Sequence, residues 1–275
     1  MRNFILKIPG KIFFYLVVIF LLYFQGEGLK SSPVDGGENK LQEVKKARLY
    51  KDIYPLISES DLYCSFFVLE NKKELDTEIV GVEREKEKML LGEHDVFYIN
   101  KGEEDGIETG HVFLILEIGP KIKKFGHLAL MRGRAKIVDT KTSRASAILE
   151  KACGQVMVGH FLVPFEEKGG LLGKDLGYDV PLPEGEGLKG MIIYSQREYQ
   201  LSGSGDWVII DLGEEDGIQF GQQLIVYRRL KKKDSPLKTV GNLIVIDTQR
   251  KTSTVKILSL NDALRVGDLV QTHFK

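Results

Sequence analysis

A six-residue stretch of this chain occurs twice. Residues 102–107 read Gly-Glu-Glu-Asp-Gly-Ile, and residues 213–218, which lie 111 positions later, read the same. The residues before each copy also correspond, because 95–99 (DVFYI) matches 206–210 (DWVII). Repetition at a fixed spacing indicates that one structural unit has been duplicated. We therefore expect two copies of one module and not a single large domain.

Each copy lies among stretches that have the length and the apolar–polar alternation of β-strands. This pattern predicts a mainly β protein with two tandem small antiparallel β-barrel-like domains, residues 59–165 and 188–275. Residues 166–187 form a Gly/Pro-rich linker between them. Six glycines and two prolines among these 22 residues argue against a strand or helix inside the linker.

Two further stretches carry a local prediction. The apolar and aromatic run 62–69 has the length of a strand and would begin module 1. The highly charged run 83–91 fits either a helix or an exposed linker that leads into the next strand. A length of 275 residues allows each module a core of its own.

The repeated stretch has the composition of a turn. An Asp-Gly pair stands between two apolar runs in each copy, and glycine accepts a positive φ without steric cost. The isoleucine that follows is expected to point back into the core. The structural turn residues are Gly102, Asp105, Gly106 and Gly110 in the first copy and Gly213, Asp216, Gly217 and Gly221 in the second.

The three adjacent acidic residues of the turn also suggest a calcium loop, since calcium binds carboxylate and carbonyl oxygens. Their spacing is not that of an EF-hand loop, and consecutive side chains do not point in one direction. The structural turn is therefore the favoured interpretation, and no metal site is predicted.

The first 28 residues have the features of a secretory signal peptide. Three basic residues come before or at the start of an apolar run of 13 residues, 12–24, and Gly26 and Gly28 could serve as the small residues of a cleavage site. A spanning helix needs about 20 apolar residues, so this run is short for a permanent anchor. A short uncleaved anchor is the alternative, and only then would the chain contact a membrane.

Residues 29–58 are expected to be a polar tether followed by a short helix within 41–50. Residues 29–40 contain several Gly, Ser and Pro residues, as is typical of a tether. Within 41–50, apolar residues share one helical face. Together with the signal peptide, the tether predicts an exported protein of the periplasm or cell envelope.

Charge argues against a nucleic-acid partner. The 39 basic and 39 acidic residues balance, and removal of residues 1–28 takes away three basic residues and one acidic residue, which leaves a net charge of −2. Nucleic-acid binding requires a basic face or stripe. The short basic run 231–233 is interpreted as a solvated hairpin tip and not as a polyanion site.

The two cysteines, Cys64 and Cys153, both fall in module 1. In an exported protein they could form a disulfide, and only one pairing exists. They could equally be two buried thiols that pack as small hydrophobic groups. The sequence leaves both alternatives open.

No arrangement typical of catalysis is present in the sequence. The histidines are not paired at helical or zinc spacing, and the chain has no nucleophile elbow, phosphate-binding loop or dinucleotide fingerprint. We therefore predict no catalytic residues, no cofactor and no enzymatic activity. The five histidines are His94, His111, His127, His160 and His273.

Several patterns in module 2 occur together in a known family. They are the strand and turn Asp-x-Val-x-Ile-x-x-Gly-x-x-Asp-Gly-Ile-x-x-Gly, a strand that ends in Val-Tyr-Arg, and Arg-Val-Gly-Asp-x-Val near the C-terminus, all within 206–270. This stretch resembles the small C-terminal β domain of the flagellar assembly T protein and related β modules that follow LysM repeats in bacterial envelope proteins. Residues 95–163 resemble it less closely, with His160 in place of Asp268.

The resemblance implies a non-catalytic exported bacterial envelope protein, a scaffold or interaction module in an envelope or flagellar-type assembly. Its partners would be envelope proteins. A peptidoglycan- or glycan-binding protein is the alternative, and a hydrolase with an unrecognised site is a third candidate. Aromatic residues are the predicted contact residues, namely Tyr199, Trp207 and Tyr227, although a single Trp is more often part of a core.

Overall fold

The computed structural model describes residues 53–83, 89–178, 187–196, 202–229 and 237–273. These residues all belong to one compact unit, 50–275, and strands predominate in them. The prediction of a mainly β fold with barrel-like modules is confirmed. The segment 1–28, the helix expected within 41–50 and the basic run 231–233 lie outside the described residues.

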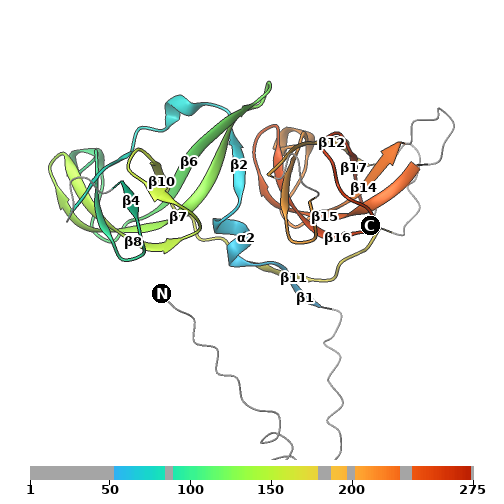
Figure 1. Ribbon diagram of the computed structural model, residues 1–275, viewed down its shortest axis with the longest axis horizontal. Coiled ribbons are helices and arrows are strands. Elements are labelled where there is room, and N and C mark those ends of the chain that lie inside the picture. The colour runs from blue at the N-terminus through green and yellow to red at the C-terminus, as the bar shows by residue number, and fades with distance from the viewer. Residues whose placement is uncertain (1–52, 84–88, 179–186, 197–201, 230–236, 274–275) are drawn as a thin grey trace, which may run out of the picture. The chain divides into compact units, whose positions relative to one another are not determined.

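Module 2 is a closed antiparallel barrel (Figure 1). Its strand order is β12-β13-β16-β15-β14-β17, and pairing of β12 with β17 closes it, with Lys189 opposite Gln271 and Met191 opposite Leu269. The strands are β12 (Lys189–Ser195), β13 (Trp207–Ile210), β14 (Gln223–Arg229), β15 (Leu237–Thr248), β16 (Ser253–Leu260) and β17 (Leu269–Thr272).

Module 1 has the corresponding order, β10-β6-β7-β8-β5-β3, and an additional strand, β2, pairs with β7. Where β12 and β17 close module 2, the described residues of module 1 have only an isolated bridge, between Glu78, which directly precedes β3, and Phe161. The strands are β2 (Phe66–Leu69), β3 (Ile79–Val82), β5 (Val96–Ile99), β6 (Val112–Ile122), β7 (Gly126–Lys141), β8 (Arg144–Ala152) and β10 (Phe161–Pro164).

Each module encloses its own apolar core. In β8, alternate residues Ala145, Ala147 and Leu149 point into the core of module 1, as the period of two in a strand requires. The isoleucines after the repeated turns, Ile107 and Ile218, belong to the cores of module 1 and module 2. The prediction that these isoleucines fold back into the core is therefore confirmed.

Strand β15 is buried on both faces from Val240 to Asp247. Leu243 and Val245 point into the barrel, and Ile244 and Ile246 point outward. The outward residues are covered by the short helix α2 (Glu59–Tyr63) and by the strand β1 (Tyr54–Ile57), through the side chains Leu56, Ile57 and Leu62. A strand covered on both sides has a continuous apolar run in place of alternation.

The prediction that residues 62–69 form one strand is wrong in its first half. Helix α2 occupies Glu59–Tyr63, and β2 begins only at Phe66. The helix begins at Ser58, whose side chain accepts a hydrogen bond from the Asp61 backbone while the Asp61 carboxylate accepts one from the Ser58 backbone. This capping box stabilises a helix start and outweighs the strand preference of the apolar residues.

The linker contains a strand that its composition argued against. Strand β11 (Leu171–Gly173) pairs with β1 in a separate two-stranded sheet. A Cβ at Gly170 would lie 2.7 Å from the carbonyl oxygen of Ile57, and a Cβ at Gly173 would lie 2.7 Å from Cδ1 of Leu56. The glycines that suggested irregular chain therefore permit close approach of the two strands.

The charged run 83–91 ends in a strand. Residues 84–88 lie outside the described residues, but Leu90–Leu91 form β4, which pairs with β9 (Val156–Met157). The choice between a helix and an exposed linker depends on the charged residues 84–88, so it stays a prediction, and only the strand at the end of the run is described.

Candidate functional site

The repeated stretch forms the same turn in both modules. Residues Glu103–Asp105 and Glu214–Asp216 are single 3-10 turns, and the glycines that follow, Gly106 and Gly217, have φ of 79° and 84°. Each turn is closed by its aspartate. The Asp105 carboxylate accepts the backbone N–H of Gly102 at 3.0 Å, and the Asp216 carboxylate accepts that of Gly213 at 2.9 Å.

The first glycine of each copy allows close packing of two backbones. A Cβ at Gly102 would collide with the carbonyl oxygen of Lys141, and a Cβ at Gly213 would collide with that of Gln249. The last glycines, Gly110 and Gly221, have φ of 97° and 77°. Their N–H groups donate to Ile137 and Val245 respectively, both at 2.9 Å.

Acidic side chains of the turn have separate hydrogen-bond partners. Glu103 accepts a hydrogen bond from the Thr140 hydroxyl at 3.1 Å, and Glu214 accepts one from Thr248 at 3.0 Å. Among the described residues no group of three or more His, Cys, Asp or Glu side chains is arranged to hold a metal ion. The geometry of the motif is that of a structural corner.

Two hydrogen bonds that close module 2 have no counterpart among the described residues of module 1. In module 2 the Thr272 N–H donates to the carbonyl oxygen of Leu188 at 3.1 Å, and the Thr272 hydroxyl accepts from the Leu188 N–H at 3.2 Å. The residue of module 1 that corresponds to Thr272 is Pro164, which has neither an N–H nor a hydroxyl group. The seam between β3 and β10 cannot continue past Leu162, whose N–H donates to Thr77 at 2.8 Å.

A second difference removes an apolar side chain from the same place. Leu212 belongs to the core of module 2 and lies against Gly190. The corresponding residue of module 1 is Lys101, which forms an ion pair with Asp76 instead. Pro164 and Lys101 together leave module 1 open at one end of its seam.

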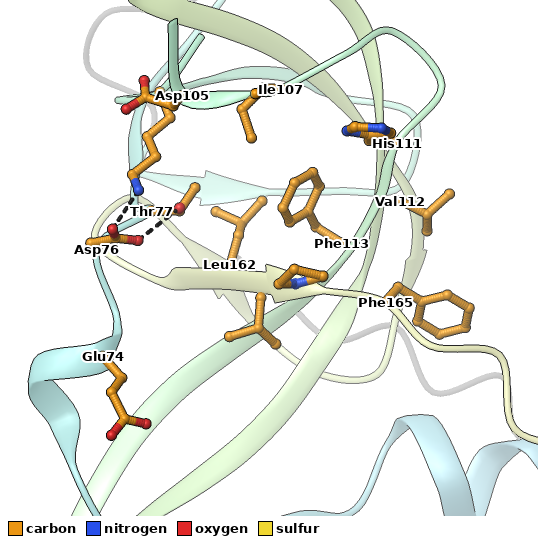
Figure 2. A pocket seen from close by; sticks show the side chains of 14 residues that line it. Glu74, Asp76, Thr77, Asp105, Ile107, His111, Val112, Phe113, Leu162 and Phe165 are labelled. Carbon is orange, nitrogen blue, oxygen red and sulfur yellow. Dashed lines mark hydrogen bonds and ion pairs between the residues drawn. The ribbon is translucent and has the colours of Figure 1, made fainter. Parts of the chain in front are cut away.

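This opening is a cleft of about 510 Å³ (Figure 2). Its floor is apolar, since Ile107, Phe113 and Leu162 are 7%, 5% and 3% exposed. Figure 2 shows these side chains between Asp76 and Asp105 on one side and His111 on the other. A volume of this size lies in the usual range of ligand-binding clefts, about 300–1,000 Å³.

The rim of the cleft is polar and mainly acidic. It includes Glu74, Asp76 and Asp105 together with Lys101 and His111. The hydrogen bond from Lys101 holds the pKa of Asp76 below its usual value, so this carboxylate is charged at neutral pH. This cleft is not among the sites predicted from the sequence, although Pro164 and Lys101, where module 1 departs from its repeat, indicate it.

A buried polar network joins module 2 to the segment that precedes β2. Asp61 of helix α2 is 4% exposed, and its carboxylate accepts hydrogen bonds from Lys256 at 2.7 Å and from the Trp207 indole at 3.0 Å. Burial acts to raise the pKa of Asp61, but hydrogen bonds from Lys256, Ser58 and Trp207 outweigh it and lower the pKa. Asp61 is therefore a buried carboxylate whose charge is stabilised by its partners.

Apolar contacts surround this network. Phe66 of β2 packs edge-on against Tyr194 and Trp207, with ring centroids 5.5 Å and 6.3 Å apart. The Thr254 hydroxyl of module 2 donates to the carbonyl oxygen of Phe66 at 2.6 Å. Since β2 also pairs with β7 of module 1, its residues contact both modules.

A disulfide joins Cys64 and Cys153 in the structure. Cys64 ends helix α2, and Cys153 follows strand β8. The bond therefore connects the segment that carries Asp61 and Phe66 to the main sheet of module 1.

The structure does not place the aromatic residues predicted to contact a partner together on an exposed surface. Tyr227 is 6% exposed, so the prediction that it lies on the surface is wrong, and its burial raises its pKa. Its strand β14 is paired on both sides, with β15 and β17. Trp207 is half-buried against Phe66, and Tyr199 lies outside the described residues.

No protein-family model and no curated protein sequence matches this chain. In the described part of the chain, no helix has the length and apolar character that a membrane crossing requires.

Proposed function

We propose that this chain is a non-catalytic, exported bacterial envelope protein that acts as a scaffold or interaction module in an envelope or flagellar-type assembly. The observation that carries the proposal is the contact of one segment, residues 54–69, with both modules. β2 extends the sheet of module 1, while α2 and β1 pack on β15 and β16 of module 2. A scaffold needs its binding surfaces held together, and this segment supplies such a connection.

Export is supported by two independent features. The basic and apolar start of the sequence fits a signal peptide. The Cys64–Cys153 disulfide fits an oxidising compartment such as the periplasm, since cytosolic thiols are kept reduced. Three of the turn acids, Glu103, Asp105 and Asp216, support a non-catalytic role, because they are engaged in structural hydrogen bonds.

The proposal is tested by crosslinking in the cells that produce the protein. A photo-reactive amino acid is placed at exposed positions of each module, for example at Phe220 and Val80, which are 44% and 43% exposed. We expect crosslinks to one or a few exported proteins. Crosslinks to cytosolic proteins, together with recovery of the chain in the cytosolic fraction, would contradict the proposal. Retention of the chain on purified cell wall without a protein crosslink would favour the glycan-binding alternative.

A further inference from the structure

The end of the barrel where the cleft lies in module 1 is filled by a side chain in module 2. In module 2, Leu188 precedes β12, packs against the apolar core and exchanges two hydrogen bonds with Thr272. Leu188 directly precedes β12, and its hydrogen bonds to Thr272 continue the pairing of β12 with β17. Module 2 therefore shows what fits at this end of the barrel, namely an extended segment with an aliphatic side chain.

In module 1 the corresponding residue is Leu75, and it does not fill this place. Leu75 follows the 3-10 turn Lys72–Glu74, and its N–H donates to Lys72. Glu74 and Asp76 line the cleft on either side of it, whereas Leu75 is not among the described residues that line the cleft or pack against the core of module 1. The space that Leu188 and Leu212 occupy in module 2 is the cleft in module 1.

The charges of the rim favour a cationic occupant. Glu74, Asp76 and Asp105 carry three negative charges, and Lys101 carries one positive charge, so these four side chains have a net charge of −2. Lys101 is already paired with Asp76. Glu74 lies at the rim and is exposed, so it can meet a cation without a desolvation penalty for itself.

Pro164 sets the mode of binding. Strand addition along β10 would need backbone N–H groups that point toward the seam, and Pro164 offers none where Thr272 offers one in module 2. An occupant must therefore be held by side chains that enter the cleft. The apolar floor of Ile107, Phe113 and Leu162 provides the pocket for such an anchor.

We propose that this cleft binds an extended peptide segment of a partner protein, in which an aliphatic or aromatic residue stands next to a Lys or Arg. The apolar side chain occupies the place of Leu188 over Phe113 and Leu162, and the cation faces Glu74 and Asp76. This inference rests on the proposed function and adds to it the site and the chemistry of the partner.

The test is selection of peptides on the full chain from a phage-displayed library of random heptapeptides. We expect the enriched peptides to share an aliphatic or aromatic residue adjacent to Lys or Arg. A synthetic peptide of the enriched sequence, labelled with fluorescein, then gives a dissociation constant by fluorescence anisotropy. Enrichment of acidic peptides, or of no common sequence, would overturn the proposal.

Two variants locate the binding. Lys101→Leu with Pro164→Thr gives module 1 the residues that accompany Leu188 in module 2, so Leu75 can bond the introduced threonine and fill the cleft, and peptide binding should be abolished. Phe220→Ala, on module 2, should leave binding unchanged. Circular dichroism shows whether the double variant is folded. Glu74→Gln with Asp76→Asn changes only exposed side chains and should weaken binding about fivefold in low salt, as expected for exposed ion pairs.

Equal binding by the folded double variant and the unchanged protein would remove the cleft as the site. Equal binding by the Glu74→Gln/Asp76→Asn variant would remove the cationic preference and overturn the proposal in its stated form. Partner crosslinks in cells together with either of these results would leave the scaffold function standing and place its binding surface elsewhere. The two proposals can therefore fail separately.

Discussion

The Nζ atom of Lys256 lies 2.7 Å from Oδ2 of Asp61, a residue 195 positions earlier in the chain, and both side chains are largely buried. Asp61 belongs to the short helix α2, and Lys256 belongs to β16 of the module 2 barrel. The pair forms only when the segment before β2 packs on module 2. It therefore reports directly on the connection that the proposed scaffold function requires.

Replacement of Asp61 by Ala is expected to destabilise the protein by about 3–5 kcal/mol, because Lys256 would keep its charge in a buried place without its partner. Urea denaturation measures the change in the free energy of unfolding. The matched control is Asp76→Ala, which removes the exposed partner of Lys101 and should cost no more than about 1 kcal/mol. Similar losses in both variants would show that the Asp61 network does not stabilise the fold.

Acid should weaken the same network. The pKa of Asp61 is lowered in the folded protein, so its contribution to stability is present above the unfolded-state pKa of about 3.9 and is lost as the pH falls through the folded-state pKa. Asp61→Asn should therefore reduce the loss of stability between pH 5 and pH 2. Urea denaturation across this range measures it. Identical acid dependence in the variant and the unchanged protein would contradict the lowered pKa.

The two repeated turns should not accept a side chain at their first glycine. Gly102→Ala and Gly213→Ala each place a Cβ against a carbonyl oxygen and should destabilise by at least about 2 kcal/mol. Gly81→Ala is the control, since a Cβ there meets no atom within 4 Å. Thermal unfolding distinguishes them. Tolerance of alanine at both turn positions would mean that the strands can separate there at little cost.

His94 holds a backbone conformation that suits glycine. Its φ is 70°, and the residue at the same place in module 2 is Gly205, with φ of 90°. Both N–H groups make the same hydrogen bond, to Leu149 and to Ile257, at 2.8 Å. His94→Gly should stabilise the protein by roughly 0.5–1 kcal/mol, because the left-handed region strains a residue with a Cβ. The reciprocal change Gly205→Ala should destabilise, and urea denaturation of both variants tests the pair.

The Cys64–Cys153 disulfide should stabilise the oxidised protein. It closes a loop with a sequence separation of 89, for which the expected contribution is about 2–4 kcal/mol. The double variant Cys64→Ser/Cys153→Ser should lose this stability, and addition of dithiothreitol should lower the melting temperature of the unchanged protein but not that of the variant. Labelling of both cysteines by iodoacetamide in protein prepared without reductant would show instead that they are free thiols.

Local patterns predicted much of the fold and part of the site. The repeated Gly-Glu-Glu-Asp-Gly-Ile stretch indicated two β modules, because a turn of this kind depends on residues that are neighbours in the chain. The same local reasoning failed at Ser58 and Asp61, where a capping box starts a helix inside an apolar run. It also failed at Gly170 and Gly173, whose composition predicts irregular chain but which allow β11 to lie against β1.

The position of the cleft could have been predicted from the sequence. Alignment of the two modules places Pro164 opposite Thr272 and Lys101 opposite Leu212, and each difference removes a group that closes module 2. The side chains that form the floor of the cleft could not be predicted from this alignment. Phe113 and Leu162 come from β6 and β10, two strands that meet only through their pairing in the sheet.

By itself the sequence determined the duplication, the β character of both modules and the corners between their strands, since these follow from glycine conformation and from the period of two. Only the tertiary structure decided that Asp61 meets Lys256 and Trp207, and that the outer face of β15 is covered. Asp61 is 195 positions from Lys256 and 146 positions from Trp207 in the sequence. These contacts depend on which surfaces of the folded modules match in shape and charge, and no local pattern records that match.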